Sequence, residues 1–278
     1  SVFVVGEGIG PRGGNFNTTL GLFDRFGPER LRDMPISERG FTTMCTGAAV
    51  TGSRPVVDFM FIDFITDAFG DLLNQTANTQ PAMLAADIAA WRVWQTAGGA
   101  SPALLAGHSL GEYAALVAAG SLNFADAIKL VRFRAEAMQA AVPEGVGAMA
   151  AILGLDDDAV RAVCGEAASG EVVEAVNLNS PGQVVIAGNK AAVERAMVLA
   201  KEKGAKRALP LPVSVPSHSS LMLPAAEKLL AHLQGVAIAT PTIPVLHNTD
   251  VQSHADVAAI RAALAKQLHT PVRWVETV

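Results

Sequence analysis

The chain has 278 residues, of which 50% are hydrophobic and only 5% aromatic, and its formal net charge is -5. This length suffices for one large domain or for a domain that carries a smaller inserted one, and the composition is typical of α/β enzymes. The negative charge argues against nucleic acid as the main partner. Without an eighteen-residue apolar run or a charged-then-apolar leader, we expect no membrane span and a cytoplasmic protein.

The first 75 residues predict a short α/β segment. Its start, "VFVVGEGIG" at residues 2–10, is an apolar strand followed by a glycine turn, and many nucleotide, phosphate and oxyanion sites begin in this way. A glycine-rich loop continues through Gly14. Further along we expect helices near "LGLFDRFG" and "ERGFTTMCTGAAVTG" and a strand at "PVVDFMFI".

Strand–turn–helix units follow, as in a parallel sheet. Residues 81–96, "PAMLAADIAAWRVWQT", have apolar positions at helical spacing, with Pro81 in the first turn of the expected helix. "PALLAG" predicts a strand, and "LGEYAALVAAG" predicts a helix that ends at Gly120. Asn123 is expected to cap the next helix, "FADAIKLVRFRAEAMQAA".

The pattern changes near Pro143, after which the elements alternate in the order βαββαβ. The expected strands are "GAMAAILGL", "VVEAVNLN", "GQVVIAG" and "KRALPLPV", and the expected helices are "DDDAVRAVCGEAA" and "KAAVERAMVLAKEKG". This order is that of a ferredoxin-like domain. The chain then returns to a helix, a strand and a helix at "LMLPAAEKLLAHLQ", "IPVLHNT" and "DVAAIRAALAKQL".

The fold class follows from this order of elements. We predict an α/β protein whose large domain, residues 76–142 and 213–278, is built on a parallel, hydrolase-like sheet. A small ferredoxin-like domain, residues 143–212, is inserted into it, and residues 1–75 form a separate segment. The two cysteines, Cys45 and Cys164, lack metal-ligand spacing and are expected to be buried free thiols.

The candidate site is Gly107-His108-Ser109-Leu110-Gly111, a G-x-S-x-G motif. Between a strand and a helix, such a motif places its serine on a tight turn, with the hydroxyl exposed above the N-terminus of the helix. Glycines are needed there because side chains would collide with the strand or the helix. On its own, the motif is also compatible with a glycine-rich turn that carries a capping serine.

Several further blocks accompany this motif. They are "TQPAMLAADIAAWRVWQ", "GHSLGEYAALVAAG", "RAEAMQAAVPEGVGAMAAILGL", "VNLNSPGQVVIAG", "GAKRALPLPVSVPSHSSLM" and "LHTPVRW". In these blocks and their order, residues 74–278 resemble the malonyl-CoA:acyl-carrier-protein transacylases of fatty acid synthesis. The resemblance implies transfer of a malonyl group from coenzyme A to the phosphopantetheine thiol of acyl carrier protein. The coenzyme A thioester would be the substrate, and no cofactor or metal is expected.

The same resemblance implies roles for particular residues. Ser109 would be the nucleophile that carries the malonyl ester, and His218 would be its general base, because a serine hydroxyl is a weak nucleophile near neutral pH. The backbone carbonyl of Gln267 would orient the histidine. Arg134 would bind the malonyl carboxylate, since an acyl group with its own charge requires a guanidinium in the pocket.

Other matching positions complete the expected pocket. The backbone N–H of Leu110 would donate to the oxyanion, and His108 would support the site from behind. Polar pocket residues are expected at Gln80, Asn177 and Asn179. For the acidic carrier protein, "KEKGAKR" at residues 201–207 is a candidate docking surface, although such a charge run is usually a solvated face.

Residues 2–75 resemble a different family, the β subunit of thiamine-diphosphate-dependent 2-oxoacid dehydrogenases. The matching blocks are "VFVVGEGIG", "GGNFNTTLGLFDRFGPERLRDMPISERGF", "GAAVTGSRPVVDFMFIDF" and "LLNQ". The resemblance implies that Glu38 would contact the aminopyrimidine ring of that cofactor, while the later histidine-bearing strands of the family have no counterpart here. Because the family changes near residues 73–75, the chain is predicted to be a chimera.

The oxyanion site is where the sequence departs most from the transacylases. Their opening string, Phe-Pro-Gly-Gln-Gly-Ser-Gln, and their segment beyond position 278 have no counterpart. "FVVGEG" can be laid on the opening strand, which places Glu7 where a glutamine would bind the oxyanion, and a carboxylate there would weaken transfer. Three alternatives stay open: a non-catalytic chimeric α/β scaffold, a serine esterase or thioesterase, and a fragmentary thiamine-dependent dehydrogenase β subunit.

Overall fold

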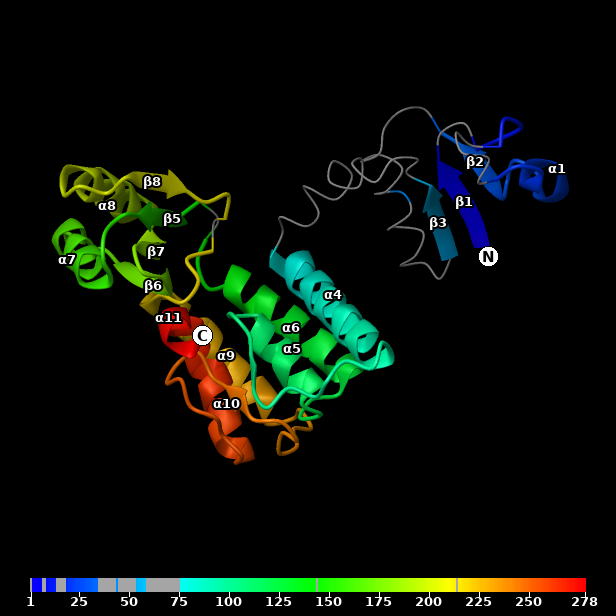
Figure 1. The fold of residues 1–278 in the computed structure, drawn as a ribbon. Helices are drawn as coiled ribbons and strands as arrows, with labels where there is room; N and C mark the ends of the chain where they lie inside the picture. The colour runs from blue at the N-terminus through cyan, green and yellow to red at the C-terminus, as the bar shows by residue number, and fades with distance from the viewer. Residues whose placement is uncertain are drawn as a thin grey trace. The chain divides into compact units, whose positions relative to one another are not determined.

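A computed structural model of the chain describes residues 2–6, 9–13, 19–34, 44, 54–58, 76–143, 145–213 and 215–278. The chain divides into two compact units, Ser1–Leu73 and Asn74–Val278. Figure 1 shows the helices and strands of each unit, with labels on those for which there is room.

The first unit contains a small parallel sheet with β1 (Val2–Gly6) at its centre. β2 (Leu31–Asp33) and β3 (Arg54–Asp58) pair with its two edges, and α1 (Leu22–Phe26) precedes β2. Phe3 and Val5 of β1 are buried, whereas Val2 at its start is exposed. The predicted opening strand, the helix near "LGLFDRFG" and the strand near "PVVDFMFI" are confirmed, whereas β2 is too short to show a periodic pattern.

Some predictions for this unit lie outside the described residues. These are Glu7, Gly14, Glu38, Cys45 and most of the expected helix "ERGFTTMCTGAAVTG".

In the second unit, helices surround a short parallel pair of strands. β4 (Leu105–Ala106) pairs with β9 (Val245–Leu246) in register Leu105↔Val245. The helices are α4 (Thr76–Thr96), α5 (Gly111–Ala118), α6 (Phe124–Gln139), α9 (Leu223–Leu233) and α10 (Val257–Lys266). Their shared core includes the buried side chains of Leu84, Leu116, Leu130, Leu229 and Leu264. The strands are shorter than the predicted "PALLAG" and "IPVLHNT".

Helix α4 begins earlier than the sequence predicts, so Pro81 lies inside the helix and not in its first turn. The residues before it, Thr76 to Gln80, have no apolar periodicity that would announce a helical turn. Tertiary contacts explain the difference, because Gln80 is buried and hydrogen-bonds to α6 through Met138 and Arg134.

The other helix boundaries follow local sequence signals. The Asn123 side chain accepts from Ala125 N at the start of α6, as predicted, and Gly120 has a φ of 70° just beyond α5. Asp156 and Asp256 cap two further helices in the same way, α7 (Asp157–Ala167) and α10.

A four-stranded antiparallel sheet lies between these helical segments in the chain. Its strands are β5 (Gly147–Leu153), β6 (Val173–Ser180), β7 (Gln183–Asn189) and β8 (Arg207–Pro210), in the order β6-β7-β5-β8. Helices α7 and α8 (Lys190–Glu202) pack on each other and on this sheet (Figure 1). The predicted βαββαβ order is therefore confirmed. Cys164 on α7 is buried, as predicted, and burial raises the pKa of its thiol to about 12.

Short elements join this sheet to the helical core. They are η1 (Ser220–Met222), η2 (Gln267–His269) and α11 (Trp274–Thr277). The Glu174 carboxylate on β6 accepts hydrogen bonds from the N–H and the hydroxyl of Ser220, and Val272 exchanges backbone hydrogen bonds with β6. These contacts hold the chain around His218 and Gln267 against the edge of the sheet. Among the described helices, none combines the length and apolar character that a membrane crossing requires.

Candidate active site

The serine of the G-x-S-x-G motif lies on a strained turn between β4 and α5. Ser109 has a φ of 50°, in the left-handed region that side chains other than glycine rarely adopt. The turn is tight at Gly107, where an added Cβ would lie 1.9 Å from the carbonyl carbon of Gly111. The turn follows the carboxyl end of β4, which pairs with β9 in parallel. In α/β proteins, functional sites form at the carboxyl ends of such parallel strands.

A hydrogen-bonded series runs from the Ser109 hydroxyl to a backbone carbonyl. Ser109 Oγ lies 2.8 Å from His218 Nε2, and His218 Nδ1 lies 2.7 Å from the carbonyl oxygen of Gln267. Because this carbonyl can only accept, the imidazole hydrogen is on Nδ1, and Nε2 is free to accept the serine proton. The three predicted residues thus come together, with the orienting contact on the main chain of Gln267.

The histidine is held in its neutral form. Burial, and secondly the positive charge of Arg134, lower the pKa of His218 from its usual 6.5 to about 3. A neutral imidazole is the form that can take a proton from a hydroxyl, so this environment suits a general base.

Arg134 is buried beside the serine, as the sequence predicts. Its Nη2 donates to Ser109 Oγ at 3.2 Å and to Gln267 Oε1 at 2.9 Å, and its Nη1 donates to Gln80 Oε1 at 2.7 Å. The guanidinium carbon lies 5.4 Å from the centre of the Tyr113 ring. A buried guanidinium beside a nucleophile can bind an anionic group on a substrate.

The remaining predicted polar residues do not contact the serine directly. Asn179 Oδ1 lies 2.9 Å from His108 Nε2. Asn177 is buried on β6 and forms no hydrogen bond to Ser109, His218 or Arg134. The N–H groups of residues 111–113 bond to carbonyls of residues 108–110, but that of Leu110 has no acceptor among the described residues.

Two buried residues of the site, Glu112 and Asn248, were missed by the sequence analysis. Asn248 Oδ1 accepts from Ser109 N at 2.7 Å, and its Nδ2 donates to the Gly107 carbonyl at 2.9 Å, which braces the serine turn. The Glu112 carboxylate accepts from Gln267 Nε2 at 2.7 Å and contacts His247 Nδ1 at 2.5 Å. A signal was present, because Asn248 follows β9 as Ser109 follows β4, and parallel strands bring their carboxyl ends together.

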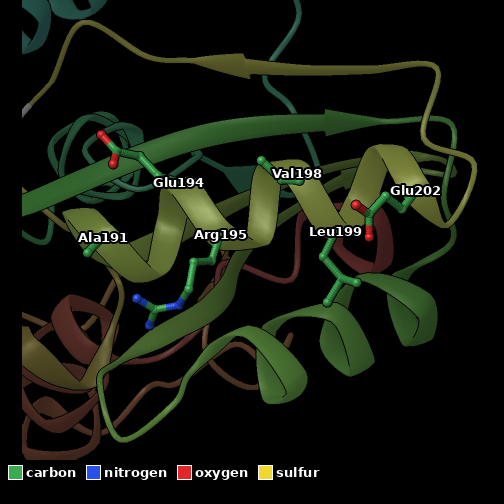
Figure 2. A pocket seen from close by; sticks show the side chains of 6 residues that line it. All are labelled: Ala191, Glu194, Arg195, Val198, Leu199 and Glu202. Atoms are coloured by element: carbon green, nitrogen blue, oxygen red, sulfur yellow. The ribbon is translucent and has the colours of Figure 1, made fainter.

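Two surface pockets lie away from this centre. One is formed along α8 (Figure 2) by Ala191, Glu194, Arg195, Val198, Leu199 and Glu202. The Arg195 guanidinium already bonds to Glu171 and to the carbonyls of Ala167 and Ala168, so its charge has a structural use. The other pocket is formed by residues 156–158, Pro181, Gly182 and Val275. In the basic run after α8, Lys203 is paired with Glu166.

A model of the acyl transferase domain matches residues 49–278. The chain belongs to the acyl transferase domain family. One relative of this acyl transferase is the malonyl CoA-acyl carrier protein transacylase of Salmonella typhimurium, 60% identical over 206 residues, with 74% of this chain and 67% of the relative covered.

Solved acyl transferase structures are similar over nearly the whole chain. The acyl-carrier-protein S-malonyltransferase of Burkholderia pseudomallei is 50% identical with a TM-score of 0.75, and the match covers 99% of this chain and 84% of the other. A malonyl-transacylase solved in complex with its type II PKS acyl-carrier protein is 46% identical with a TM-score of 0.76, covering 100% and 84%.

A second family model, the transketolase pyrimidine binding domain, matches residues 1–94. It overlaps the acyl transferase match over residues 49–94, a stretch that contains the boundary between the two compact units after Leu73. The first residues are therefore similar to a transketolase-type pyrimidine binding domain.

The steric demand at the serine turn can be tested with a matched pair of variants. Gly107→Ala should lower the free energy of unfolding by about 3 kcal/mol, because the new Cβ overlaps the backbone of Gly111. Gly111→Ala should leave it within about 0.5 kcal/mol, since no atom lies within 4 Å of the added Cβ. Urea denaturation measures both, and equal effects would contradict the geometry.

The neutral state of His218 predicts a dependence of stability on pH. The unfolded chain binds a proton at this side chain near pH 6.5, but the folded chain binds it only near pH 3, so the free energy of unfolding falls as the pH falls between these values. His218→Asn removes this contribution. Between pH 6 and pH 4 the free energy of unfolding of the variant, measured by urea denaturation, should therefore fall less steeply than that of the wild type. The two slopes should differ by about 1.4 kcal/mol per pH unit. Parallel curves would contradict the lowered pKa of His218.

Proposed function

We propose that the chain is an acyltransferase that moves a malonyl group from coenzyme A to the phosphopantetheine thiol of acyl carrier protein. The observation that carries this proposal is the 2.8 Å contact between Ser109 Oγ and a neutral His218 Nε2, beside a buried Arg134. The relatives named as malonyl CoA-acyl carrier protein transacylases, and the one solved with a carrier protein, support the choice of substrates.

The reaction would run in two halves through one serine ester. In the first, His218 Nε2 takes the proton of Ser109 as Oγ attacks the thioester carbonyl, and the imidazolium returns that proton to the departing coenzyme A thiolate. In the second, Nε2 takes the proton of the carrier thiol, whose sulfur attacks the ester, and serine regains its proton. The unpaired N–H of Leu110 would donate to the oxyanion in both halves.

Arg134 would select the malonyl group. Its guanidinium can form a charge-assisted pair with the free carboxylate of the substrate, while Gln80 holds it from the other side. The polar side chains of Asn177 and Asn179 would line the pocket, with Asn179 acting through His108.

We also propose the domain organisation that the sequence predicts. The hydrolase-like large domain would comprise residues 76–142 and 213–278, with the ferredoxin-like domain at 143–212 inserted into it, and the βαββαβ order and the β6-β7-β5-β8 sheet support this division. The transketolase-type match and the separate unit before Asn74 support the proposal that residues 1–75 come from another family and that the chain is a chimera.

The same proposal covers cofactors, docking and location. No cofactor would be needed, because the thioester itself supplies the activated acyl group, and the protein would act in the cytoplasm. The carrier protein would approach through the basic residues of the run at 201–207, although the pairing of Lys203 with Glu166 reduces the free charge there.

The test is acylation of the protein by malonyl-CoA, followed by intact mass. We expect one malonyl adduct in the wild-type chain, none in Ser109→Ala, and transfer of the group when carrier protein is added. Arg134→Ala should acylate about 30-fold more slowly with malonyl-CoA but not with acetyl-CoA, because only the malonyl group has a carboxylate to bind. A folded wild-type chain without an adduct would favour the non-catalytic scaffold, and an adduct lost only to water would favour an esterase.

The match to the transketolase pyrimidine binding domain favours one second candidate, a thiamine-dependent function of residues 1–75. It requires binding of thiamine diphosphate that is weakened in Glu38→Gln. Because the later histidine-bearing strands of that family have no counterpart in the sequence, we expect calorimetry with thiamine diphosphate and Mg²⁺ to show no binding. Binding that Glu38→Gln weakens would restore this candidate.

A further inference from the structure

Arg134 is a buried cation, 1% exposed, that no carboxylate of the described residues contacts. It donates to the neutral oxygens of Gln80, Ser109 and Gln267, and its Nε is buried without a partner in the described part of the chain. Burial lowers its pKa, and the negative charge of Glu112 is among the influences that oppose this shift. An isolated buried charge is costly, so the charge of Glu112 matters to this pocket.

Glu112 reaches Arg134 through a single amide group. The carboxylate is fully buried in the first turn of α5 and accepts from Gln267 Nε2 at 2.7 Å, and Gln267 Oε1 accepts from Arg134 at 2.9 Å. The helix N-terminus also favours a negative charge at this position. The order Glu112–Gln267–Arg134 therefore links an anion to a cation across one side chain.

Glu112 and the carbonyl of Ser109 together determine which way the Gln267 amide points. Gln267 Nε2 faces two groups that can only accept, the Glu112 carboxylate and the carbonyl oxygen of Ser109 at 3.0 Å. The amide nitrogen must therefore lie on that side. As a result Oε1, an acceptor, faces the guanidinium, which only donates.

His247 is a further side chain in contact with Glu112. Its Nδ1 lies against the carboxylate, while its Nε2 is buried without a partner in the described part of the chain. His247 therefore touches the carboxylate without contacting Gln267 or Arg134, which makes it a suitable position for a control variant.

We propose that Glu112 is a positioning residue for acyl-group selection, acting on Arg134 through the Gln267 amide. Its negative charge stabilises the buried guanidinium, and its acceptor-only oxygens hold the amide that aligns the guanidinium with Ser109. This inference rests on the proposed function, because it concerns the arginine that would bind the malonyl carboxylate.

The experiment compares acylation of Ser109 by malonyl-CoA and by acetyl-CoA in the full chain, measured by intact mass at single turnover. In Glu112→Gln the side chain keeps an oxygen that can accept from Gln267 Nε2 but loses its negative charge, so the hydrogen bond that supports the Gln267 amide changes from charged to neutral. We expect the ratio of malonyl to acetyl acylation rates to fall about tenfold, since a charged hydrogen bond is weakened. Equal losses for both substrates, or an unchanged ratio, would overturn the proposal.

Two further variants separate this role from a general loss of structure. His247→Asn changes a neighbour of the same carboxylate but keeps its charge and its contact with Gln267, so the ratio should remain that of the wild type. Gln267→Met removes the amide but keeps the main-chain carbonyl that contacts His218, so the ratio should fall as in Glu112→Gln. If Glu112→Gln does not fold, an unchanged ratio in Gln267→Met overturns the proposal.

The wild-type chain distinguishes failure of this inference from failure of the proposed function. A wild-type chain that forms no serine adduct with malonyl-CoA removes the proposed function, and this inference with it. A wild-type chain that prefers malonyl-CoA, together with a Glu112→Gln chain that keeps the preference, removes only the role of Glu112.

Discussion

The site depends on Gln267, a residue that uses both its main chain and its side chain. Its carbonyl fixes His218, its Oε1 holds Arg134, and its Nε2 bonds to the carbonyl of Ser109, a residue 158 positions earlier in the chain. Nucleophile, base and anion-binding group therefore share one support at the start of η2. A shift of this short helix would move all three, so its packing against α9 and α10 is part of the site.

The parallel strands supply the second requirement, a turn rigid enough to hold serine in a strained conformation. Surrounding contacts offset the cost of the left-handed backbone conformation of Ser109. Asn248 accepts a hydrogen bond from its N–H, and the missing side chain of Gly107 allows the helix to approach. Because β4 and β9 are side by side, residues 107–109 and Asn248 meet although they are far apart in sequence. The strands are short, but their pairing decides where the site lies.

The buried charged side chains of the site are arranged so that opposite charges lie close together, which lowers the free-energy cost of burying them. Arg134 and Glu112 have opposite charges and share a neutral amide, while His218 is uncharged. Both charged side chains form hydrogen bonds, although Arg134 Nε has no partner among the described residues, and the base stays ready to accept a proton. The four-stranded sheet supports the site through β6. Asn179 on this strand hydrogen-bonds to His108, and Val272 forms backbone hydrogen bonds with the same strand.

Local sequence patterns determined much of the architecture. Helix caps such as Asn123, the βαββαβ order and the strand–turn–helix around Ser109 depend on neighbouring residues, and all are present. The start of α4 and the length of β4 were not predictable in this way, because tertiary contacts of Gln80 and pairing with a distant strand decide them.

The same division applies to the candidate site. Ser109, His218, Arg134 and Gln267 were expected from motifs and a resemblance, and the fold brings them together. The supporting contacts of Glu112 and His247 were not expected, because a buried polar residue has no short-range signature, whereas the place of Asn248 after β9 was a signal that the sequence did contain. The sequence by itself determined which residues could do the chemistry. Only the tertiary structure decided what holds them, because their hydrogen bonds join parts of the chain that no local pattern connects.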